Sequence, residues 1–221
     1  MKKETSSQSR RVFIKKSSFA TAGIALSPAI LASTKIQEKD KIRIGIAGGS
    51  FGAGFQWHEH PDCIVEAVAE LRADRLQHLA QTYNCSKTYT SLEKMVKDPN
   101  IDAIGVFTPG PLHVQHAIEA LRHGKHVISA VPACWGSVED ANRLLEVVKE
   151  TGLTYMLAET SYYQQTSISV RKLYNEGKFG NLYQCNSFYH HDGLERIYFD
   201  HNGKRTWRYG MPPMWYPTHC T

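Results

Sequence analysis

The 221-residue sequence has few cysteines, no C-x-x-C pair and no internal repeat. Its five cysteines are odd in number and widely spaced: Cys63, Cys85, Cys134, Cys185 and Cys220. This spacing excludes a disulfide framework and a zinc site built on paired cysteines. The histidine-rich runs His58-Glu59-His60 and His190-His191-Asp192 lack a third ligand at a familiar spacing, so we predict turn or surface histidines and no metal site.

The chain also lacks net charge outside its first residues. The formal charge is +5, and residues 1–16 supply all of it, with six Lys or Arg against one Glu. The rest of the chain has 20 basic and 20 acidic residues, which leaves no electrostatic footprint for nucleic acid. A hydrophobic share of 42% excludes a disordered chain and supports a packed core.

No long apolar run follows the basic N-terminus. Residues 17–34 carry no charge, yet their small polar residues and Pro28 make them too weakly apolar for a stable membrane anchor. The run Ser9-Arg10-Arg11-Val12-Phe13-Ile14-Lys15 resembles a twin-arginine export signal. We therefore predict a signal peptide over residues 1–36 and a periplasmic or other extracytoplasmic protein. A route that carries folded proteins suits a protein that must first fold around a cytoplasmic dinucleotide.

After this segment, apolar β-type runs alternate with helical patterns. The expected strands are 42–47, 65–70, 103–107, 126–130 and 153–158, and the expected helices include 73–83 and 166–176. A capping box at Thr90 to Glu93 starts another helix, and Ser137 to Asp140 caps one with Ala141, Leu144, Leu145 and Val148 on its inner face. Val114, Ala117, Ile118 and Leu121 predict a further helix that Gly124 ends. This alternation predicts an α/β fold with a doubly wound parallel Rossmann sheet.

The pattern changes after about residue 160. We predict a Rossmann domain over residues 37–160 and the start of a C-terminal α/β substrate domain with an open sheet over 161–221. Its expected features are the helix 166–176, a turn at Gly177 to Gly180 and a strand near 181–190. The sequence stops at Thr221 without a final strand, so we expect a fragment of a longer protein.

The segment 41–54 predicts a buried strand that runs into a glycine-rich turn. The turn residues are Gly48, Gly49, Ser50, Phe51 and Gly52. Glycines let backbone N–H groups approach a pyrophosphate, and the start of the following helix carries partial positive charge. Ser50 and Ala53 stand where G-x-G-x-x-G has its second and third glycines. The turn alone therefore fits a tight strand-to-helix connection without a ligand equally well.

Glu70 ends the next β-type run, about twenty residues further on, where a carboxylate can bind the ribose hydroxyls of a dinucleotide. A carboxylate there repels a 2′-phosphate, so NAD is favoured over NADP, and Arg72 softens that preference. Together the turn and Glu70 predict an NAD(P) site.

Three further motifs resemble the Gfo/Idh/MocA oxidoreductases, which include glucose-fructose oxidoreductase and inositol dehydrogenase. They are Thr108-Pro109-Gly110-Pro111-Leu112-His113, Gly124-Lys125-His126-Val127 and Pro132. The turn Gly177 to Gly180 is similar to that family's entry into its substrate domain. The resemblance covers about residues 41–221 and implies that Thr108, Pro109, His113 and Pro132 bind the cofactor, with Pro132 supporting the nicotinamide ring.

The sequence departs from the family at two motifs. The family's C-E-K-P motif corresponds to Ser129-Ala130-Val131-Pro132, so its glutamate and its lysine are absent, and valine cannot donate a proton to a sugar hydroxyl. The family's Asp and His pair corresponds to Trp215 and His219. The string Tyr216-Pro217-Thr218-His219 is similar to that of the NAD-dependent α-N-acetylgalactosaminidase branch, as is Glu159-Thr160-Ser161-Tyr162-Tyr163. In that branch the resemblance implies that NAD transiently oxidises a ring hydroxyl, the aglycone is eliminated, water adds and the hydride returns.

His219 is the predicted general base because imidazole titrates near neutrality, and Tyr216 or Tyr163 is predicted to polarise a hydroxyl. The alternatives are a packed histidine and tyrosines of the core or rim. Three functions stay open: an exported NAD(P)-dependent oxidoreductase acting on a sugar or polyol, a glycoside hydrolase that recycles NAD, and a non-catalytic nucleotide-binding remnant. The expected partner is a small carbohydrate, without nucleic acid or a stable membrane anchor, and a homo-oligomer is left open.

Overall fold

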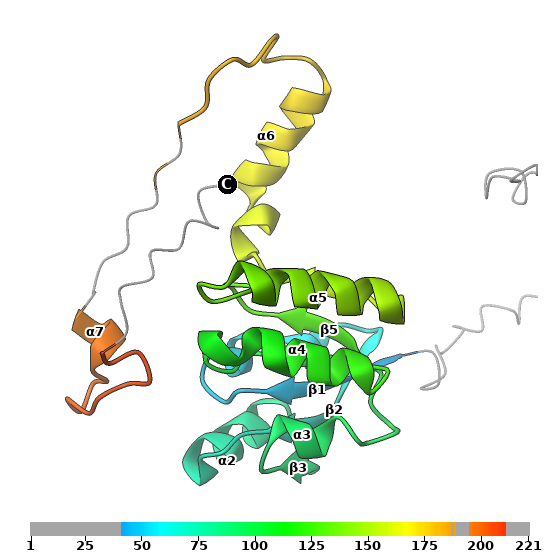
Figure 1. The fold of residues 1–221 in the computed structure, drawn as a ribbon, viewed down its shortest axis with the longest axis vertical. Helices are drawn as coiled ribbons and strands as arrows, with labels where there is room; N and C mark the ends of the chain where they lie inside the picture. The colour runs from blue at the N-terminus through cyan, green and yellow to red at the C-terminus, as the bar shows by residue number, and fades with distance from the viewer. Residues whose placement is uncertain (1–40, 187, 189–194, 211–221) are drawn as a thin grey trace, which may run out of the picture. The chain divides into compact units, whose positions relative to one another are not determined.

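The computed structural model describes residues 41–186, 188 and 195–210. Within them, six strands form one sheet: β1 (Ile42–Ala47), β2 (Cys63–Ala69), β3 (Thr88–Tyr89), β4 (Ala103–Val106), β5 (His126–Ser129) and β6 (Tyr155–Leu157). The strand order is β3-β2-β1-β4-β5-β6, and every neighbouring pair is parallel (Figure 1). This is the order of a doubly wound Rossmann sheet, which confirms the predicted fold class.

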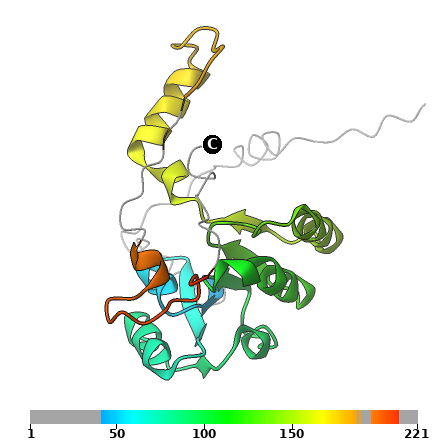
Figure 2. The same ribbon diagram turned by 60° about the vertical axis from the view of Figure 1, so that its left-hand side comes forward.

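Helices connect the strands because parallel neighbours need a crossover. The α-helices are α2 (Ala73–Thr82), α3 (Leu92–Met95), α4 (His113–Arg122), α5 (Val138–Thr151), α6 (Gln165–Asn175) and α7 (Glu195–Tyr198). The 3-10 turns are η2 (Phe51–Gly54), η3 (Trp57–Glu59), η4 (Gly110–Leu112) and η5 (Thr160–Tyr163). Figure 2 shows α2 on one side of the strands and α4 with α5 on the other.

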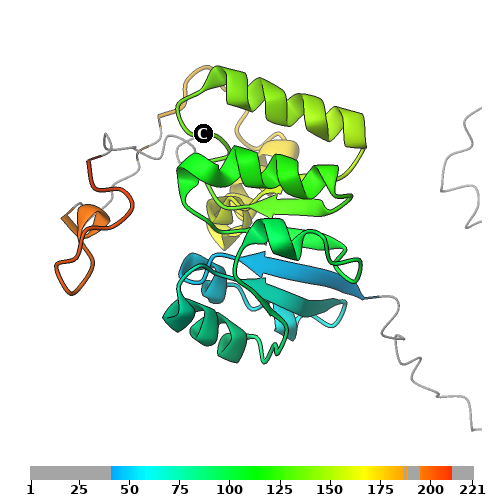
Figure 3. The same ribbon diagram turned by 60° about the horizontal axis from the view of Figure 1, so that its bottom comes forward.

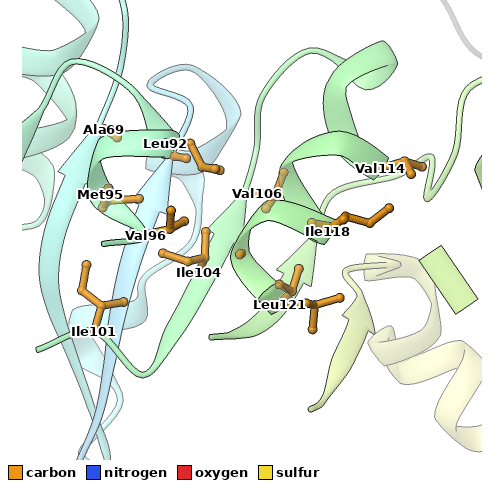
Figure 4. Close-up of a cluster of buried hydrophobic side chains, with 14 of the residues drawn as sticks. Ala69, Leu92, Met95, Val96, Ile101, Ile104, Val106, Val114, Ile118 and Leu121 are labelled. Atoms are coloured by element: carbon orange, nitrogen blue, oxygen red, sulfur yellow. The ribbon is translucent and has the colours of Figure 1, made fainter. Parts of the chain in front are cut away.

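One face of the sheet packs against α3, α4 and α5. The cluster joins β4 residues to apolar side chains of these helices, and Figure 4 shows ten of its labelled residues: Ala69, Leu92, Met95, Val96, Ile101, Ile104, Val106, Val114, Ile118 and Leu121. Helices α4 and α5 lie side by side in Figures 1 and 3. Each large apolar side chain buried in this way contributes about 2 kcal/mol from area removed from water.

The opposite face packs against α2 and the 3-10 turns. Ile44, Ile46, Val65 and Val68 of the strands meet Leu79 and Tyr83 of the α2 region, together with Phe107 and Ala130. Rings of Phe51, Phe55, Trp57 and Phe107 extend this cluster, with centroids 4.7 Å apart for Phe55 and Phe107. Phe51 belongs to the turn after β1, so this aromatic cluster packs against that turn and supports it.

Several predicted elements are confirmed, with boundaries shifted by at most two residues. All five predicted strands are present, and Ser137 caps α5 by accepting a 3.1 Å hydrogen bond from the Asp140 N–H. Gly124 follows α4 with φ +76°, the left-handed conformation that ends a helix. The short edge strand β3 was not predicted, because two residues are too few to show the alternation of apolar and polar side chains that is typical of a strand.

Three local predictions are wrong. The N-cap of α3 is Ser91 rather than Thr90, because the helix begins one residue later than the capping box indicates. Leu145 is 50% exposed and Val147 is buried, since the inner stripe of α5 passes through Leu144 and Val147. Between β1 and β2, where every residue is described, there is no α-helix but only η2 and η3.

The strand predicted near 181–190 is absent from its described part. Residues 181–186 and 188 form no regular structure and pair with no strand. A β-strand needs a partner to satisfy its backbone N–H and C=O groups, and the described residues offer none to this segment. The other residues of the predicted strand lie outside the described part, and so does the predicted signal peptide.

Candidate functional site

The candidate site lies where the chain leaves the carboxyl ends of β1, β2, β4 and β5. All four strands are parallel, so these ends share one edge of the sheet. From β1 the chain winds towards β2 and β3, whereas from β4 it winds towards β5 and β6. The connections after β1 and β4 therefore diverge, and such a switch point is where α/β sheets bind ligands.

Gly48 brings the turn after β1 close to the residues after β4. Its φ is +110°, and a Cβ at this position would lie 2.2 Å from the carbonyl oxygen of Phe107. Its N–H donates a 3.0 Å hydrogen bond to the carbonyl of Ala69 at the end of β2. Only glycine fits both the backbone conformation and the contact, so Gly48 joins three strand ends at one point.

Gly49 is bonded to Glu70. The Gly49 N–H donates to Glu70 Oε2 at 2.6 Å, while Glu70 Oε1 accepts from the N–H groups of Leu71 at 2.8 Å and Arg72 at 3.1 Å. These bonds fix a carboxylate at the turn after β1. A Cβ on Gly49 would lie 2.9 Å from Arg75 Cβ, so the first turn of α2 also lies against this position.

The turn after β1 leads into η2, which contradicts the expected helix start. A four-residue 3-10 helix sums few peptide dipoles, so the partial charge predicted for an α-helix N-terminus is not available there. Gly52 takes the close-packing position of the third glycine: its Cβ would lie 3.1 Å from Ile46 Cγ2 and 3.2 Å from the Phe107 ring. Ser50 is exposed, and Phe51 is 52% exposed at the tip of the turn.

Tyr83 anchors the turn from α2. Its hydroxyl contacts the carbonyl oxygens of Gly52, within η2, and of Phe55, the residue that follows η2. Burial raises the pKa of Tyr83 to about 12, so the phenol stays neutral and donates its proton at physiological pH. Nothing in the spacing of Tyr83 distinguishes it from an ordinary core tyrosine, so this role was not predicted.

His113 joins the segments that follow β4 and β5. Its Nε2 lies 2.7 Å from the carbonyl oxygen of Thr108, its Nδ1 lies 2.7 Å from the carbonyl oxygen of Pro132, and its side chain is buried. A carbonyl oxygen only accepts, so the ring nitrogen that carries a proton donates to the carbonyl that it faces. The predicted cofactor residues Thr108, His113 and Pro132 are thus in direct contact, and Pro109 lies between the first two.

A second histidine on α4, His116, faces the same segment. Its Nδ1 lies 2.8 Å from Thr108 Oγ1 and its Nε2 lies 3.5 Å from Glu93 Oε1. Burial is the main cause that lowers the pKa of His116, which favours a neutral ring. With its proton on Nε2 toward Glu93, the ring accepts from the Thr108 hydroxyl. His116 was also missed, although its i, i+3 spacing from His113 places both on one face of α4.

Trp135 covers the Thr108 to His113 segment. A Cβ on Gly110 would lie 2.7 Å from Trp135 Cε3. The indole therefore packs directly against the backbone of Gly110, where any other residue would place a side chain. The residues that correspond to the family's glutamate and lysine lie in the connection from β5: Ala130 is buried and Val131 half-buried, and neither carries a polar side-chain atom.

Of the predicted catalytic residues, only Tyr163 lies in the described part of the chain. It ends η5, after β6, with 56% of its surface exposed and its ring 5.1 Å from that of Tyr162. Tyr216 and His219 lie outside the described residues, so their roles stay predictions. In the described part, no group of three His, Cys, Asp or Glu side chains is placed to hold a metal ion. The cysteines found there, Cys63, Cys85, Cys134 and Cys185, are free thiols.

The described residues fit a dinucleotide. Gly48 and Gly49 let the turn after β1 pack closely against the ends of β4 and β2, and Glu70 presents a carboxylate at the end of β2. The strand order puts this turn at the switch point. Fold and site together define a protein of the dinucleotide-binding Rossmann class.

Comparison with known sequences gives the family. The sequence profile of the Gfo/Idh/MocA oxidoreductases, an oxidoreductase family with an NAD-binding Rossmann fold, matches residues 42–159. The match extends over more than half of the chain, and the chain belongs to this family. The resemblance inferred from the motifs is thereby confirmed.

Known relatives differ in activity. A glycosyl hydrolase family 109 protein of Streptomyces coelicolor is 25% identical over 194 residues, which cover 80% of this chain and 41% of that protein. The crystal structure of scyllo-inositol dehydrogenase from Lactobacillus casei, with NAD(H) and scyllo-inositol bound, matches with a TM-score of 0.60 and 23% identity over 64% of this chain and 43% of that chain. A 3-ketoreductase from Actinomadura kijaniata in complex with NADP matches at 0.56 and 26% identity, over 62% and 43%.

The chain spans about half the length of the curated relatives it matches, with 41% and 53% of two family 109 proteins covered. Among the residues described, no helix is both long enough and apolar enough to cross a membrane.

Proposed function

We propose that the protein is an NAD(P)-dependent oxidoreductase that transfers a hydride to or from a hydroxyl-bearing carbon of a sugar or polyol, with NAD favoured over NADP. The observation that carries this proposal is the Gly49 to Glu70 hydrogen bond at the switch point of the sheet. It places a carboxylate beside the turn that a diphosphate would approach. A bound dinucleotide supplies the nicotinamide ring that accepts or returns the hydride.

The described residues bind and orient that group. Glu70 is placed to accept hydrogen bonds from ribose hydroxyls, since its oxygens already lie at the end of β2 among backbone N–H groups. His113 locks the segments after β4 and β5 to each other through the Thr108 and Pro132 carbonyls. These two contacts of His113 hold Pro132 in a fixed position, where the proline ring supports one face of the nicotinamide.

Proton transfer at the substrate is assigned to His219, with Tyr216 and Tyr163 as hydroxyl donors. The support is chemical: imidazole exchanges protons near neutral pH, and a neutral phenol orients a substrate hydroxyl. Val131 stands where the family has its lysine, and the valine side chain cannot donate a proton. Another side chain must therefore transfer the proton to or from the substrate hydroxyl.

A second candidate is a glycoside hydrolase that oxidises and then re-reduces its sugar within one turnover. Two observations favour it: the Tyr216-Pro217-Thr218-His219 string, and the similarity to family 109 glycosyl hydrolases along 80% of the chain. The loss of the lysine at Val131 is compatible with it, because the chemistry then depends on a base that removes a carbon-bound proton.

One experiment separates the candidates. The purified protein is titrated with NAD⁺ and NADP⁺ by calorimetry, then incubated with free sugars and polyols and with 4-nitrophenyl glycosides. Net NADH formation from a sugar supports the oxidoreductase, and nitrophenol release at constant NADH supports the hydrolase. Nucleotide binding without turnover of either substrate class identifies a binding remnant, while absence of nucleotide binding contradicts all three.

We further propose that the protein is exported in its folded state. The support is the Ser9 to Lys15 string with its two adjacent arginines and the weakly apolar stretch that follows.

A further inference from the structure

Arg72 and Asp74 form a two-pronged ion pair directly after Glu70. Arg72 Nε donates to Asp74 Oδ1 at 3.1 Å, and Arg72 Nη2 donates to Asp74 Oδ2 at 2.6 Å. Both oxygens of the carboxylate therefore hold the planar guanidinium in one orientation. The side chains are 49% and 66% exposed, so solvent and dissolved ligands reach the pair.

The pair lies beside the carboxylate that meets the ribose. The Arg72 N–H donates to Glu70 Oε1 at 3.1 Å, and Asp74 belongs to the first turn of α2. In Rossmann folds an arginine near this acidic residue accommodates the 2′-phosphate of NADP. Arg72 has the required charge and position, but Asp74 takes two of its N–H donors and adds a negative charge of its own.

We propose that Asp74 is a specificity-determining residue that holds the Arg72 guanidinium away from a 2′-phosphate and so reinforces the preference of Glu70 for NAD. The inference rests on the proposed nucleotide-binding function. Asp74 acts through Arg72 and is in this sense a positioning residue. Removing its charge frees a cation next to the ribose and removes one repulsive carboxylate.

A purely structural role for Asp74 makes a different prediction. An acidic residue in the first turn stabilises a helix by its charge, and its loss lowers the free energy of unfolding without changing which nucleotide binds. The ratio of the NADP⁺ and NAD⁺ dissociation constants therefore separates the two roles. It is measured by calorimetry on the purified protein.

Asp74→Asn is expected to tighten NADP⁺ binding about three- to tenfold, the range for releasing an exposed charged hydrogen-bond donor, with NAD⁺ binding changed less than about twofold. Asp74→Glu keeps the charge and is expected to keep the wild-type ratio. Adenosine 2′,5′-bisphosphate and AMP serve as smaller probes, since they differ only in the 2′-phosphate. The same gain is expected for the bisphosphate alone.

Arg72 and Arg122 provide a matched pair of variants. Arg122 ends α4 and is exposed, at the end of that helix opposite to the Thr108 segment. Arg72→Ala in the Asp74→Asn background is expected to abolish the gain in NADP⁺ affinity, whereas Arg122→Ala in that background is expected to keep it.

Two results would overturn the inference while leaving the proposed function intact: NAD⁺ binding with an unchanged ratio in Asp74→Asn, or a gain that survives Arg72→Ala. Failure of the wild-type protein to bind either nucleotide would overturn the proposed function itself. Circular dichroism checks that each variant is folded, so a lost signal is not mistaken for a change in preference.

Discussion

The backbone N–H of Gly49 donates a 2.6 Å hydrogen bond to Glu70 Oε2, which ties the turn after β1 to the end of β2. The same carboxylate accepts two N–H groups from the start of the β2-to-α2 connection. Glu70 therefore holds the turn in shape and also presents negative charge to the ribose side of the proposed nucleotide. A short 3-10 turn follows Ser50 in place of the expected α-helix, so the proposed nucleotide recognition depends on this carboxylate and the glycine backbone.

Glu70→Gln is expected to weaken NAD⁺ binding about tenfold, because a charged acceptor for the ribose hydroxyls is replaced by a neutral amide. NADP⁺ binding should fall less or rise, since the repulsion of the 2′-phosphate is removed. Calorimetric titration measures both. Glu66→Gln, on the same strand and paired with Lys87 at 3.4 Å, is the control and should leave both constants unchanged.

Gly48→Ala is expected to destabilise the protein by about 3 kcal/mol, because its Cβ would lie 2.2 Å from the Phe107 carbonyl oxygen. Gly124→Ala shares a positive φ but meets open space, so its cost should stay near 1 kcal/mol. Urea unfolding followed by circular dichroism gives both values. Equal costs at the two positions would show that backbone conformation alone, and not the close approach to β4, requires Gly48.

His113→Ala is expected to lower the free energy of unfolding by about 2 kcal/mol, because a buried ring that contacts the Thr108 and Pro132 carbonyls is lost. His123→Ala, at the exposed end of the same helix, should change it by less than about 0.5 kcal/mol. If His113 also positions Pro132 for the nicotinamide, the His113→Ala protein that still folds should bind NAD⁺ more weakly. Unchanged NAD⁺ affinity would limit His113 to a role in stability.

Stability should fall as the pH drops through the region just below 6.5, and His116 is the cause. Burial lowers the pKa of His116 from the ordinary value of 6.5 and outweighs the nearby Glu93, which raises it. The unfolded chain therefore binds a proton at a higher pH than the folded protein does, so acid favours unfolding. The melting temperature, followed from pH 7.5 to 5.5, should fall less in His116→Gln than in the wild type, and an exposed control, His78→Gln, should behave as the wild type.

Export should depend on the paired arginines. Arg10→Lys combined with Arg11→Lys is expected to keep the protein in the cytoplasm, because the twin-arginine pattern is then lost while the positive charge is retained. Lys2→Gln combined with Lys3→Gln is the control that removes charge and keeps the pattern. Immunoblots of cytoplasmic and extracytoplasmic fractions measure the outcome. Export of the arginine variant would contradict the predicted route.

The sequence predicted the sheet well because each central strand is a short apolar run bounded by turn residues. Residues 42–47 were placed without error, and α4 was predicted from Val114, Ala117, Ile118 and Leu121, all of which are buried against the sheet. The local pattern and the tertiary environment agree in these elements, so local reasoning is sufficient.

Other predictions failed where the outcome depends on distant residues. The helix expected after the glycine turn is replaced by η2 and η3. The hydroxyl of Tyr83, about thirty residues further along the chain, contacts the η2 segment, and the Phe107 ring packs against Gly52 of η2. The strand expected near 181–190 has the apolar content of a strand but no partner among the described residues. Neither result could be predicted from the segment itself, because hydrogen-bond partners that decide it come from elsewhere in the chain.

The sequence by itself determined the class of fold, the position of the nucleotide turn and the acidic residue that accompanies it, since periodicity, glycine and a carboxylate at a fixed offset are local features. Only the tertiary structure decided that the Gly49 N–H donates to Glu70 and that His113 contacts the carbonyls of Thr108 and Pro132. It also decided that Asp74 forms an ion pair with Arg72. The physical reason is that a side chain's charge and donors act on whatever lies within hydrogen-bonding distance. In this protein that distance is set by parallel strands that bring their carboxyl ends to one edge.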